Sequence, residues 1–226
     1  MIWWPIEVPT LVNGLLRLRP VIQSDIELIY EGCQDPIIPK FTTIPSNYTI
    51  DMAKQYVNER IPQNFAKQTE IIFAVDFDKK FCGTFSLHTI DHYNHRAEVG
   101  YWIVKDMREK GVGTKAVELI TEFGLMSVGF KRIEAMVDVE NEASRKLLLN
   151  AGYEFEGILR QRVTNNDGKQ IDMAVYAATR NWMMSKNRIY IYGITRIISK
   201  FHFGNFIFCW RAKEKVKPSK QPGQKF

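Results

Sequence analysis

Residues 108–114 are the part of this chain best suited to bind an anion. Two glycines follow an arginine in the pattern Arg108-x-x-Gly111-x-Gly113, and apolar residues at helical spacing come next. The amides at the start of a helix have no partner within it, and the helix dipole adds partial positive charge there. Glycines lack the Cβ atoms that would hold an anion away from the backbone, and Arg108 and Lys110 add charge. The segment therefore predicts a phosphate or diphosphate site.

Two common phosphate-binding motifs are excluded by the spacing. The phosphate loop of nucleotide hydrolases needs Gly, four residues and then Gly-Lys-Ser or Gly-Lys-Thr, which this segment lacks. A dinucleotide fingerprint needs a third glycine at the position of Ala116. The pattern that remains leaves two interpretations open on its own, a coenzyme loop or an ordinary glycine-containing turn between a strand and a helix.

The elements that would position this segment alternate between strand and helix. Residues 99–104 are β-branched or aromatic in alternation and predict a strand that runs into it. A long helix is expected over 111–128 and a strand over 132–139. A further helix over 141–150 ends at Gly152.

The rest of the chain completes a mixed α/β domain over residues 10–180. We expect a strand at 15–19, and then a helix from Ser24 to Asp35 that begins with a capping box of Ser24 and Glu27. A loop over 37–48 leads to a second helix, which begins at Thr49 and ends at Pro62. Four further strands are expected at 71–77, 81–90, 154–163 and 171–178, the last two joined by an Asn165-Asn166-Asp167-Gly168 turn.

Composition is that of a globular domain with a real core, since the chain has 226 residues of which 45% are hydrophobic. Three cysteines without paired spacing indicate neither a disulfide framework nor a zinc motif, and they favour a reducing, cytoplasmic setting. The N-terminus lacks the basic and apolar regions of a secretory signal.

The basic character of the chain belongs to its last part, residues 181–226. This segment has ten Lys and Arg against one acid, whereas the first 180 residues have 21 basic and 24 acidic side chains. It contains no run of about 18 uncharged apolar residues, which argues against a transmembrane helix. We expect a poorly ordered extension; weak contact with a nucleic acid or an anionic membrane is the alternative.

A second motif separates the two interpretations of the glycine segment. It has the form N-x-x-S-x-x-x-L-x-x-x-G-Y-x-x-E-G and comprises Asn141, Ser144, Leu148, Gly152, Tyr153, Glu156 and Gly157. With R-x-x-G-x-G and the stretches LRLRPVIQSDIELIY and EVGYWI, it resembles the GNAT superfamily of N-acetyltransferases, in particular the RimJ/RimL type, which acetylates N-terminal amines of ribosomal proteins. The resemblance implies an α+β fold with a central, mostly antiparallel, twisted sheet. Helices would cover both faces, and the sheet would be splayed between its fourth and fifth strands.

The resemblance also implies acetyl-CoA as co-substrate and no metal. The pantetheine arm would lie along strand 99–104 like an added strand, and a backbone N–H near Ile103 or Val104 would polarise the thioester carbonyl. The diphosphate would lie on the amides of the glycine segment. The implied coenzyme-binding residues are Ile103, Val104, Arg108, Glu109, Lys110, Gly111, Val112, Gly113, Thr114, Asn141 and Ser144.

Two residues are the candidates for proton transfer. An amine arrives protonated and must lose a proton before it attacks a thioester, and Glu98 is the expected general base, acting through water. Its alternative role is a surface carboxylate paired with Arg96. Ser144 matches the serine that serves the leaving thiolate in this type, and its alternative is a helix-surface serine. Many relatives use a tyrosine as the acid, and none falls at that place here. Asn141 suits pantetheine binding, an N-cap, or both.

The acceptor is the least determined part of the prediction. Phe41, Thr42 and Tyr101 are the candidate acceptor-binding residues, and the segments 41–44 and 160–171 would set the choice of amine. A protein N-terminus is expected; a polyamine, an antibiotic or an amino sugar is the alternative, as is a non-catalytic coenzyme-binding module with a basic tether. Monomer and homodimer both stay open.

One further cluster could suggest a metal. It consists of His88, Asp91, His92 and His95. These residues lie on an expected hairpin, without helical spacing and without a cysteine, so a solvated turn is the preferred interpretation and no metal site is predicted.

Overall fold

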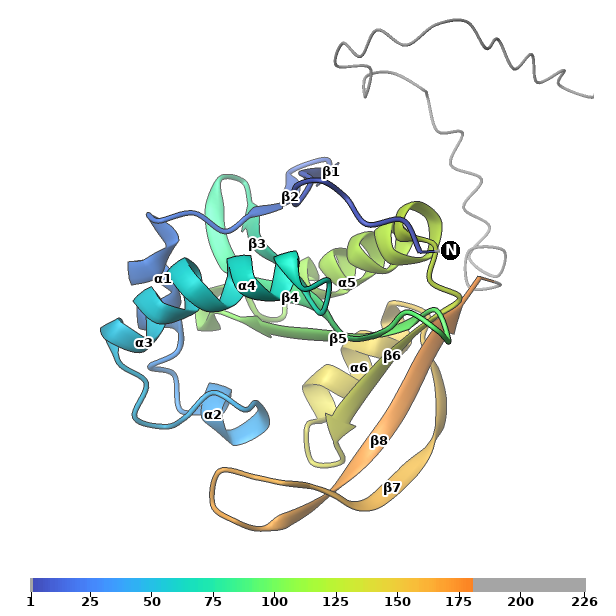
Figure 1. Ribbon diagram of the computed structural model, residues 1–226. Helices are drawn as coiled ribbons and strands as arrows, with labels where there is room; N and C mark the ends of the chain where they lie inside the picture. The colour runs from blue at the N-terminus through green and yellow to red at the C-terminus, as the bar shows by residue number, and fades with distance from the viewer. Residues whose placement is uncertain (1, 181–226) are drawn as a thin grey trace, which may run out of the picture. The chain divides into compact units, whose positions relative to one another are not determined.

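The computed structural model describes residues 2–180, in which eight strands form one sheet with the order β1-β2-β3-β4-β5-β6-β8-β7 (Figure 1). Every neighbouring pair is antiparallel except β5 and β6. The strands are β1 Leu11–Asn13, β2 Leu16–Pro20, β3 Ile71–Phe77, β4 Lys80–Asp91, β5 Arg96–Ile103, β6 Arg132–Asp138, β7 Glu154–Thr164 and β8 Gln170–Thr179. The expected mostly antiparallel sheet is confirmed; only β1 was missed, a strand of three residues that pairs with β2.

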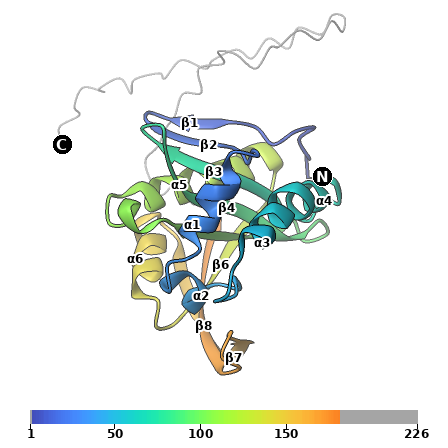
Figure 2. The ribbon, with the colours of Figure 1, turned by 90° about the vertical axis from the view of Figure 1, so that its left-hand side faces the viewer.

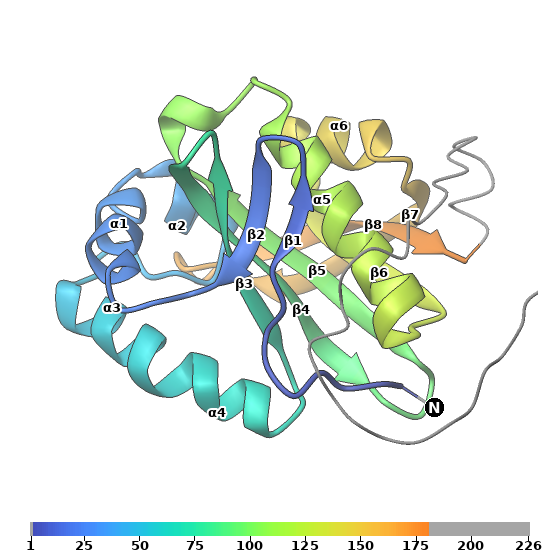
Figure 3. The ribbon, with the colours of Figure 1, turned by 90° about the horizontal axis from the view of Figure 1, so that it is seen from above.

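Helices cover both faces of the sheet. One face carries α1 Asp25–Gly32, α2 Ile37–Phe41, α3 Ile50–Gln55 and α4 Ile61–Ala66, and the π-helical turn η1 Tyr56–Arg60 joins the last two (Figure 2). The other face carries α5 Val112–Glu122, its continuation η3 Phe123–Val128, and α6 Glu142–Asn150 (Figure 3). A short 3₁₀ turn, η2 Lys105–Met107, links β5 to the segment before α5. Each face has its own apolar cluster, and the larger one lies under α5 and α6.

The sheet parts between β5 and β6. These parallel strands pair at Arg96–Arg132, Ala97–Ile133 and Glu98–Glu134, whereas β6 continues to Asp138 and β5 to Ile103 without further pairing between them. Figure 1 shows the two strands starting together and then diverging. β5 and β6 are the fourth and fifth of the expected strands, because the expectation did not include β1. The splayed sheet expected from the resemblance is therefore confirmed, and β5 has an open edge beyond Glu98.

Two expectations about helix ends are wrong. The Ser24 side chain makes no capping hydrogen bond, because its backbone is already helical and the Asp25 carboxylate instead accepts from Ile22 N at 2.8 Å. The helix that was expected to end at Pro62 continues to Ala66. The π-helical turn before Pro62 changes the hydrogen-bonding register at the point where proline cannot donate.

Two other helix ends are as expected. Thr49 caps α3 by accepting from Met52 N at 3.3 Å. Gly152, at φ +85°, closes α6 with a hydrogen bond from Tyr153 N to Leu148 O at 3.0 Å. The short helix α2 lies in the segment that was expected to be a loop.

A buried ion pair fastens α1 to the sheet and supplies a first prediction. Arg19 on β2 holds Asp25 through two hydrogen bonds of 2.7 and 2.8 Å and also contacts Asp76 on β3 at 2.7 Å, while the Asp25 side chain is 1% exposed. We expect Arg19→Met to lower the free energy of unfolding by about 3–5 kcal/mol, because it leaves a buried carboxylate unpaired. Urea unfolding measures this. Arg17→Met, at an exposed position of the same strand, is the control and should change little.

Candidate active site

The open edge of β5 presents free backbone groups to the gap. Val104 N donates to Cys82 O at 2.9 Å, so the amide of Val104 points toward β4. Amides alternate in direction along an antiparallel strand, and those of Val99, Tyr101 and Ile103 therefore point toward the gap beside β6. Of the two amides expected near the thioester carbonyl, that of Val104 is already engaged with Cys82 O, and that of Ile103 faces the gap.

The start of α5, at the far end of this edge, has the features expected of an anion cradle, the name used below for the amides from Gly111 to Thr114. Gly111 is the N-cap residue, at φ +73°, and no side chain caps the helix. A Cβ at Gly111 would meet nothing within 4 Å, so the space beside this residue is open. Glu109 also has a positive φ, +61°, which bends the segment around these amides. An uncapped N-terminus of an eleven-residue helix suits a diphosphate.

Gly113 also serves close packing, a role that the sequence did not indicate. A Cβ on this buried residue would lie 2.5 Å from Ile103 Cδ1 and 2.6 Å from Leu147 Cδ1. Gly113 therefore lets the first turn of α5 pack directly against the end of β5 and against α6. The position of the cradle relative to the open strand edge depends on this contact.

The Arg108 side chain contacts other parts of the protein, whereas the sequence analysis predicted that its guanidinium would contact the diphosphate. Its Nε donates to Ile103 O at 2.9 Å, and its Nη1 lies 2.8 Å from Asp35 Oδ2 without hydrogen-bond geometry. Its Nη2 is buried and has no partner within residues 2–180. A buried orphan donor at the mouth of the gap fits a ligand oxygen, as does the exposed ammonium of Lys110.

Glu98 lies at the fork, where β5 and β6 make their last pair. Its neighbour in register is Glu134 on β6, and His88 lies opposite on β4. Burial, and then the negative charge of Glu134, raise the pKa of Glu98, while Arg162 and Arg96 act in the opposite direction. A half-buried carboxylate with a raised pKa is what a general base needs.

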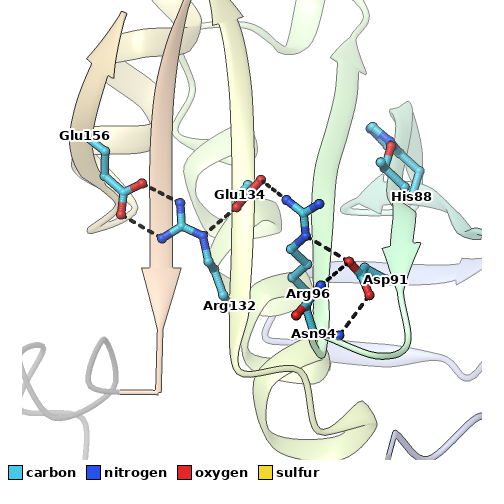
Figure 4. A network of polar contacts seen from close by, with 8 residues as sticks. His88, Asp91, Asn94, Arg96, Arg132, Glu134 and Glu156 are labelled. Carbon is cyan, nitrogen blue, oxygen red and sulfur yellow. Dashed lines mark hydrogen bonds and ion pairs between the residues drawn. The ribbon is translucent and has the colours of Figure 1, made fainter. Parts of the chain in front are cut away.

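The alternative pairing of Glu98 with Arg96 is contradicted. Arg96 contacts Asp91 at 3.3 Å and Glu134 at 3.4 Å instead. Arg132 continues this series from Glu134 to Glu156, so that alternating charges run across β4, β5, β6 and β7 beside the fork (Figure 4). The contacts with Arg96 and Arg132 hold the Glu134 side chain next to Glu98.

Ser144 lies across the gap from Glu98, on the other face of the sheet. Asn141 Oδ1 accepts from Ser144 N at 3.1 Å, which confirms Asn141 as the N-cap of α6. Ser144 Oγ is 2.7 Å from the hydroxyl oxygen of Tyr101, so it is not a simple surface serine. Tyr101 was expected to contact the acceptor. Its side chain instead packs on the α5–α6 face of the sheet, opposite to the face that carries the Glu98 side chain. The contact between Tyr101 and Ser144 was not predicted, because the two residues are far apart in the sequence.

The two segments expected to choose the acceptor are in contact. Asn166 Nδ2, at the tip of the β7–β8 hairpin, donates to Pro39 O at 2.8 Å and Ile44 O at 2.9 Å, and lies 3.4 Å from Thr42 O. The Thr42 hydroxyl donates to Ile38 O at 2.7 Å, so it stabilises the end of α2 and is not free for an acceptor. Phe41 lies beside it, half-buried, under the Lys40 ammonium. Asn166 was predicted only as a turn residue.

The histidine-rich hairpin gives no metal site within the part of the chain that the structure describes, where no three His, Cys, Asp or Glu side chains converge. His88 hydrogen-bonds Thr89 and His92 contacts Gln68 O. Among the same residues, no helix is long and apolar enough to cross a membrane.

Comparison with known proteins agrees with this geometry. Residues 16–154 match the acetyltransferase (GNAT) domain family. An N-acetyltransferase designated p20 from Bacillus licheniformis is 30% identical over 171 residues, which cover 74% of this chain and 94% of that protein.

Two solved structures share the fold. RimL, a ribosomal alpha-N-protein acetyltransferase in complex with coenzyme A, is 17% identical with a TM-score of 0.69 over 76% of this chain and 97% of its own. The microcin self-immunity acetyltransferase MccE, in complex with acetyl-CoA and AMP, is 24% identical with a TM-score of 0.68, over 74% of this chain and 93% of its own.

Proposed function

The chain belongs to the GNAT acetyltransferase family and is an acetyl-CoA-dependent N-acetyltransferase, and from this premise we propose that it acetylates a primary amine, in particular a protein N-terminus, with Glu98 as general base. One observation carries the proposal: β5 and β6 part directly after Glu98 and Glu134, and the uncapped start of α5 lies at the other end of the open edge. Base and anion cradle are therefore at opposite ends of one slot.

The residues of the slot fit the coenzyme. The amides from Gly111 to Thr114, with Lys110 and the orphan Nη2 of Arg108, would hold the diphosphate. The gap-facing groups of Val99, Tyr101 and Ile103 would pair with the pantetheine amides. When bound there, acetyl-CoA supplies an activated acetyl group. Asn141 and Ser144 line the α6 side.

The base and the hydroxyl donor lie on opposite faces of the sheet, with the gap between them. Glu98 would accept a proton from the amine through a water on the α1–α4 face, a gap-facing amide of β5 would donate to the carbonyl oxygen, and Ser144 would hydrogen-bond the departing sulfur on the α5–α6 face. This separation lets an amine approach one side of the acyl group while the thiolate leaves on the other.

The preference for a protein N-terminus is supported by the RimJ/RimL-like motifs and by the fold shared with RimL. A small-molecule amine is the second candidate acceptor. It is supported by the fold shared with MccE, whose structure was solved with a nucleotide, which is a small molecule. The experiment is a release assay for coenzyme A thiol on a panel of peptides with free or blocked N-termini, spermidine and amino sugars. Release with free N-termini alone supports the proposal. Release with small amines alone contradicts the acceptor, and coenzyme binding without release from any amine indicates a non-catalytic module.

A second prediction concerns the acceptor loop. Asn166→Ala removes the hydrogen bonds that tie the β7–β8 tip to Pro39 and Ile44, so we expect the KM for the acceptor to rise about tenfold while the KM for acetyl-CoA stays unchanged. Steady-state kinetics with each substrate varied in turn measures both constants. Asn165→Ala changes the same turn without touching α2 and serves as the control. Equal changes in the two KM values would contradict a specific effect on the acceptor.

Several expectations remain predictions. The domain limits 10–180 and a cytoplasmic setting are among them, as is the choice between monomer and homodimer. The basic segment 181–226, with its expected poor order and its weak nucleic-acid or membrane contact, lies outside the described residues.

A further inference from the structure

Tyr101 and Ser144 place two hydroxyl groups against each other across the parted strands. Tyr101 comes from β5 and Ser144 from α6, the helix that follows β6, and their oxygens are 2.7 Å apart. Because β5 and β6 are unpaired at this level, the contact joins the two sides of the slot.

The surroundings decide which hydroxyl donates. The Tyr101 ring stacks on Phe85, with centroids 5.1 Å apart and planes within 16°, and burial raises the pKa of its phenol so that it stays protonated at neutral pH. Tyr101 and Ser144 are both half-buried. The phenol is the more acidic of the two groups, which favours Tyr101 as the donor and Ser144 Oγ as the acceptor. In this arrangement the hydrogen of Ser144 is left for a group in the slot.

We propose that Tyr101 is a positioning residue that, by donating to Ser144 Oγ, directs the Ser144 hydrogen toward the sulfur of the coenzyme. The inference rests on the proposed function. In the step it serves, the C–N bond forms and the C–S bond breaks with its electron pair passing to sulfur. The amine proton goes to Glu98 through water. The Ser144 O–H hydrogen-bonds the thiolate, which takes a proton from solvent on release.

The first test is Tyr101→Phe, which keeps the ring on Phe85 and removes the hydroxyl. We expect kcat to fall about tenfold, the effect of one lost hydrogen bond of ordinary strength, with the KM for acetyl-CoA unchanged. Tyr153→Phe is the matched control, because the Tyr153 hydroxyl also pairs with a single hydroxyl, that of Thr121 at 2.6 Å, and does not contact Ser144 in that pairing. It should lower stability and leave kcat at the wild-type value.

Two further readouts separate positioning from mere packing. Ser144→Ala combined with Tyr101→Phe should be no slower than Ser144→Ala alone, because Tyr101 acts only through Ser144. Wild-type kcat in Tyr101→Phe, or effects that multiply in the double variant, would overturn the inference.

The second readout needs no turnover and so survives failure of the proposed function. Calorimetry compares coenzyme A with its S-methyl thioether on each variant at pH values below and above the thiol pKa. The wild type should bind coenzyme A more tightly than the S-methyl thioether, and this preference should grow as the pH rises and the thiolate forms. Both Tyr101→Phe and Ser144→Ala should lose that preference. A change in the stability of a variant affects the binding of both ligands equally, so it cancels in the ratio of the two dissociation constants. An undiminished preference in Tyr101→Phe contradicts the inference even if no amine is acetylated.

Discussion

Glu98→Gln should lower kcat by about 10²–10⁴ while leaving the affinity for acetyl-CoA unchanged, because removal of a general base has effects of this size. The substitution keeps the size of the side chain at the fork and removes only its ability to take a proton. The expected loss lies in kcat because Glu98 is at the closed end of the slot, far along β5 from the α5 cradle. Steady-state kinetics with a free N-terminal peptide, together with calorimetric binding of coenzyme A, separate the two quantities.

The control for this experiment is Glu154→Gln, an exposed glutamate at the start of β7. It should retain wild-type kinetics. If Glu98→Gln kept wild-type kcat, or if its coenzyme affinity fell in parallel with kcat, the assignment of Glu98 as the base would be wrong.

The pH dependence of kcat is a second test of Glu98 as the general base. Glu98 acts in its deprotonated form, and burial and the charge of Glu134 raise its pKa, so activity should fall with decreasing pH sooner than an ordinary glutamate would predict. Glu134→Gln removes the neighbouring negative charge and should therefore move this acidic limb to lower pH. Arg96 and Arg132 keep their other partners, Asp91 and Glu156, in this variant. All variants are measured with the same acceptor, so the protonation of its amine contributes equally to every pH profile.

The sequence was sufficient for the parts of the site that depend on backbone direction. Alternation along residues 99–104, the glycine at 111 and the helix after it predicted a strand and a helix start with free amides, and both depend on local conformation. The separation of β5 from β6 came from the family resemblance, since periodicity gives no information on which neighbours a strand lacks.

The side-chain contacts between distant elements were not predictable in this way. Arg108 was predicted as a ligand for a phosphate, but its ion pair with Asp35, more than seventy positions earlier, was not predicted. The meeting of Tyr101 with Ser144 depends on the angle at which α6 crosses the slot, which no short pattern encodes. Asn166 on the acceptor loop is a similar case, because a turn residue is predicted from its backbone while its amide partners come from α2 and the loop after it.

The packing of Gly113 leads to the second large effect, which is a loss of coenzyme affinity. Gly113→Val introduces a branched side chain where even a Cβ would lie 2.5 Å from Ile103 Cδ1 and 2.6 Å from Leu147 Cδ1, so the packing of the first turn of α5 against the end of β5 and against α6 must change. Misplacing positioned groups by about 1 Å can lower a reaction rate by about 10²-fold, and we expect a loss of the same order in the affinity for the coenzyme. Calorimetric titration with coenzyme A should show a dissociation constant raised by that order.

The matched control is Gly124→Val, in η3 at the other end of the same helical segment. A Cβ at Gly124 would lie 2.6 Å from Ile133 Cδ1 and 3.0 Å from Leu87 Cδ1, a similar crowding that is remote from the cradle. Both variants should lose stability, but only Gly113→Val should lose coenzyme affinity in proportion to the shift of the cradle. Equal losses of affinity would mean that the fold as a whole is responsible. Native affinity in Gly113→Val would mean that the diphosphate binds elsewhere than on the amides at the start of α5.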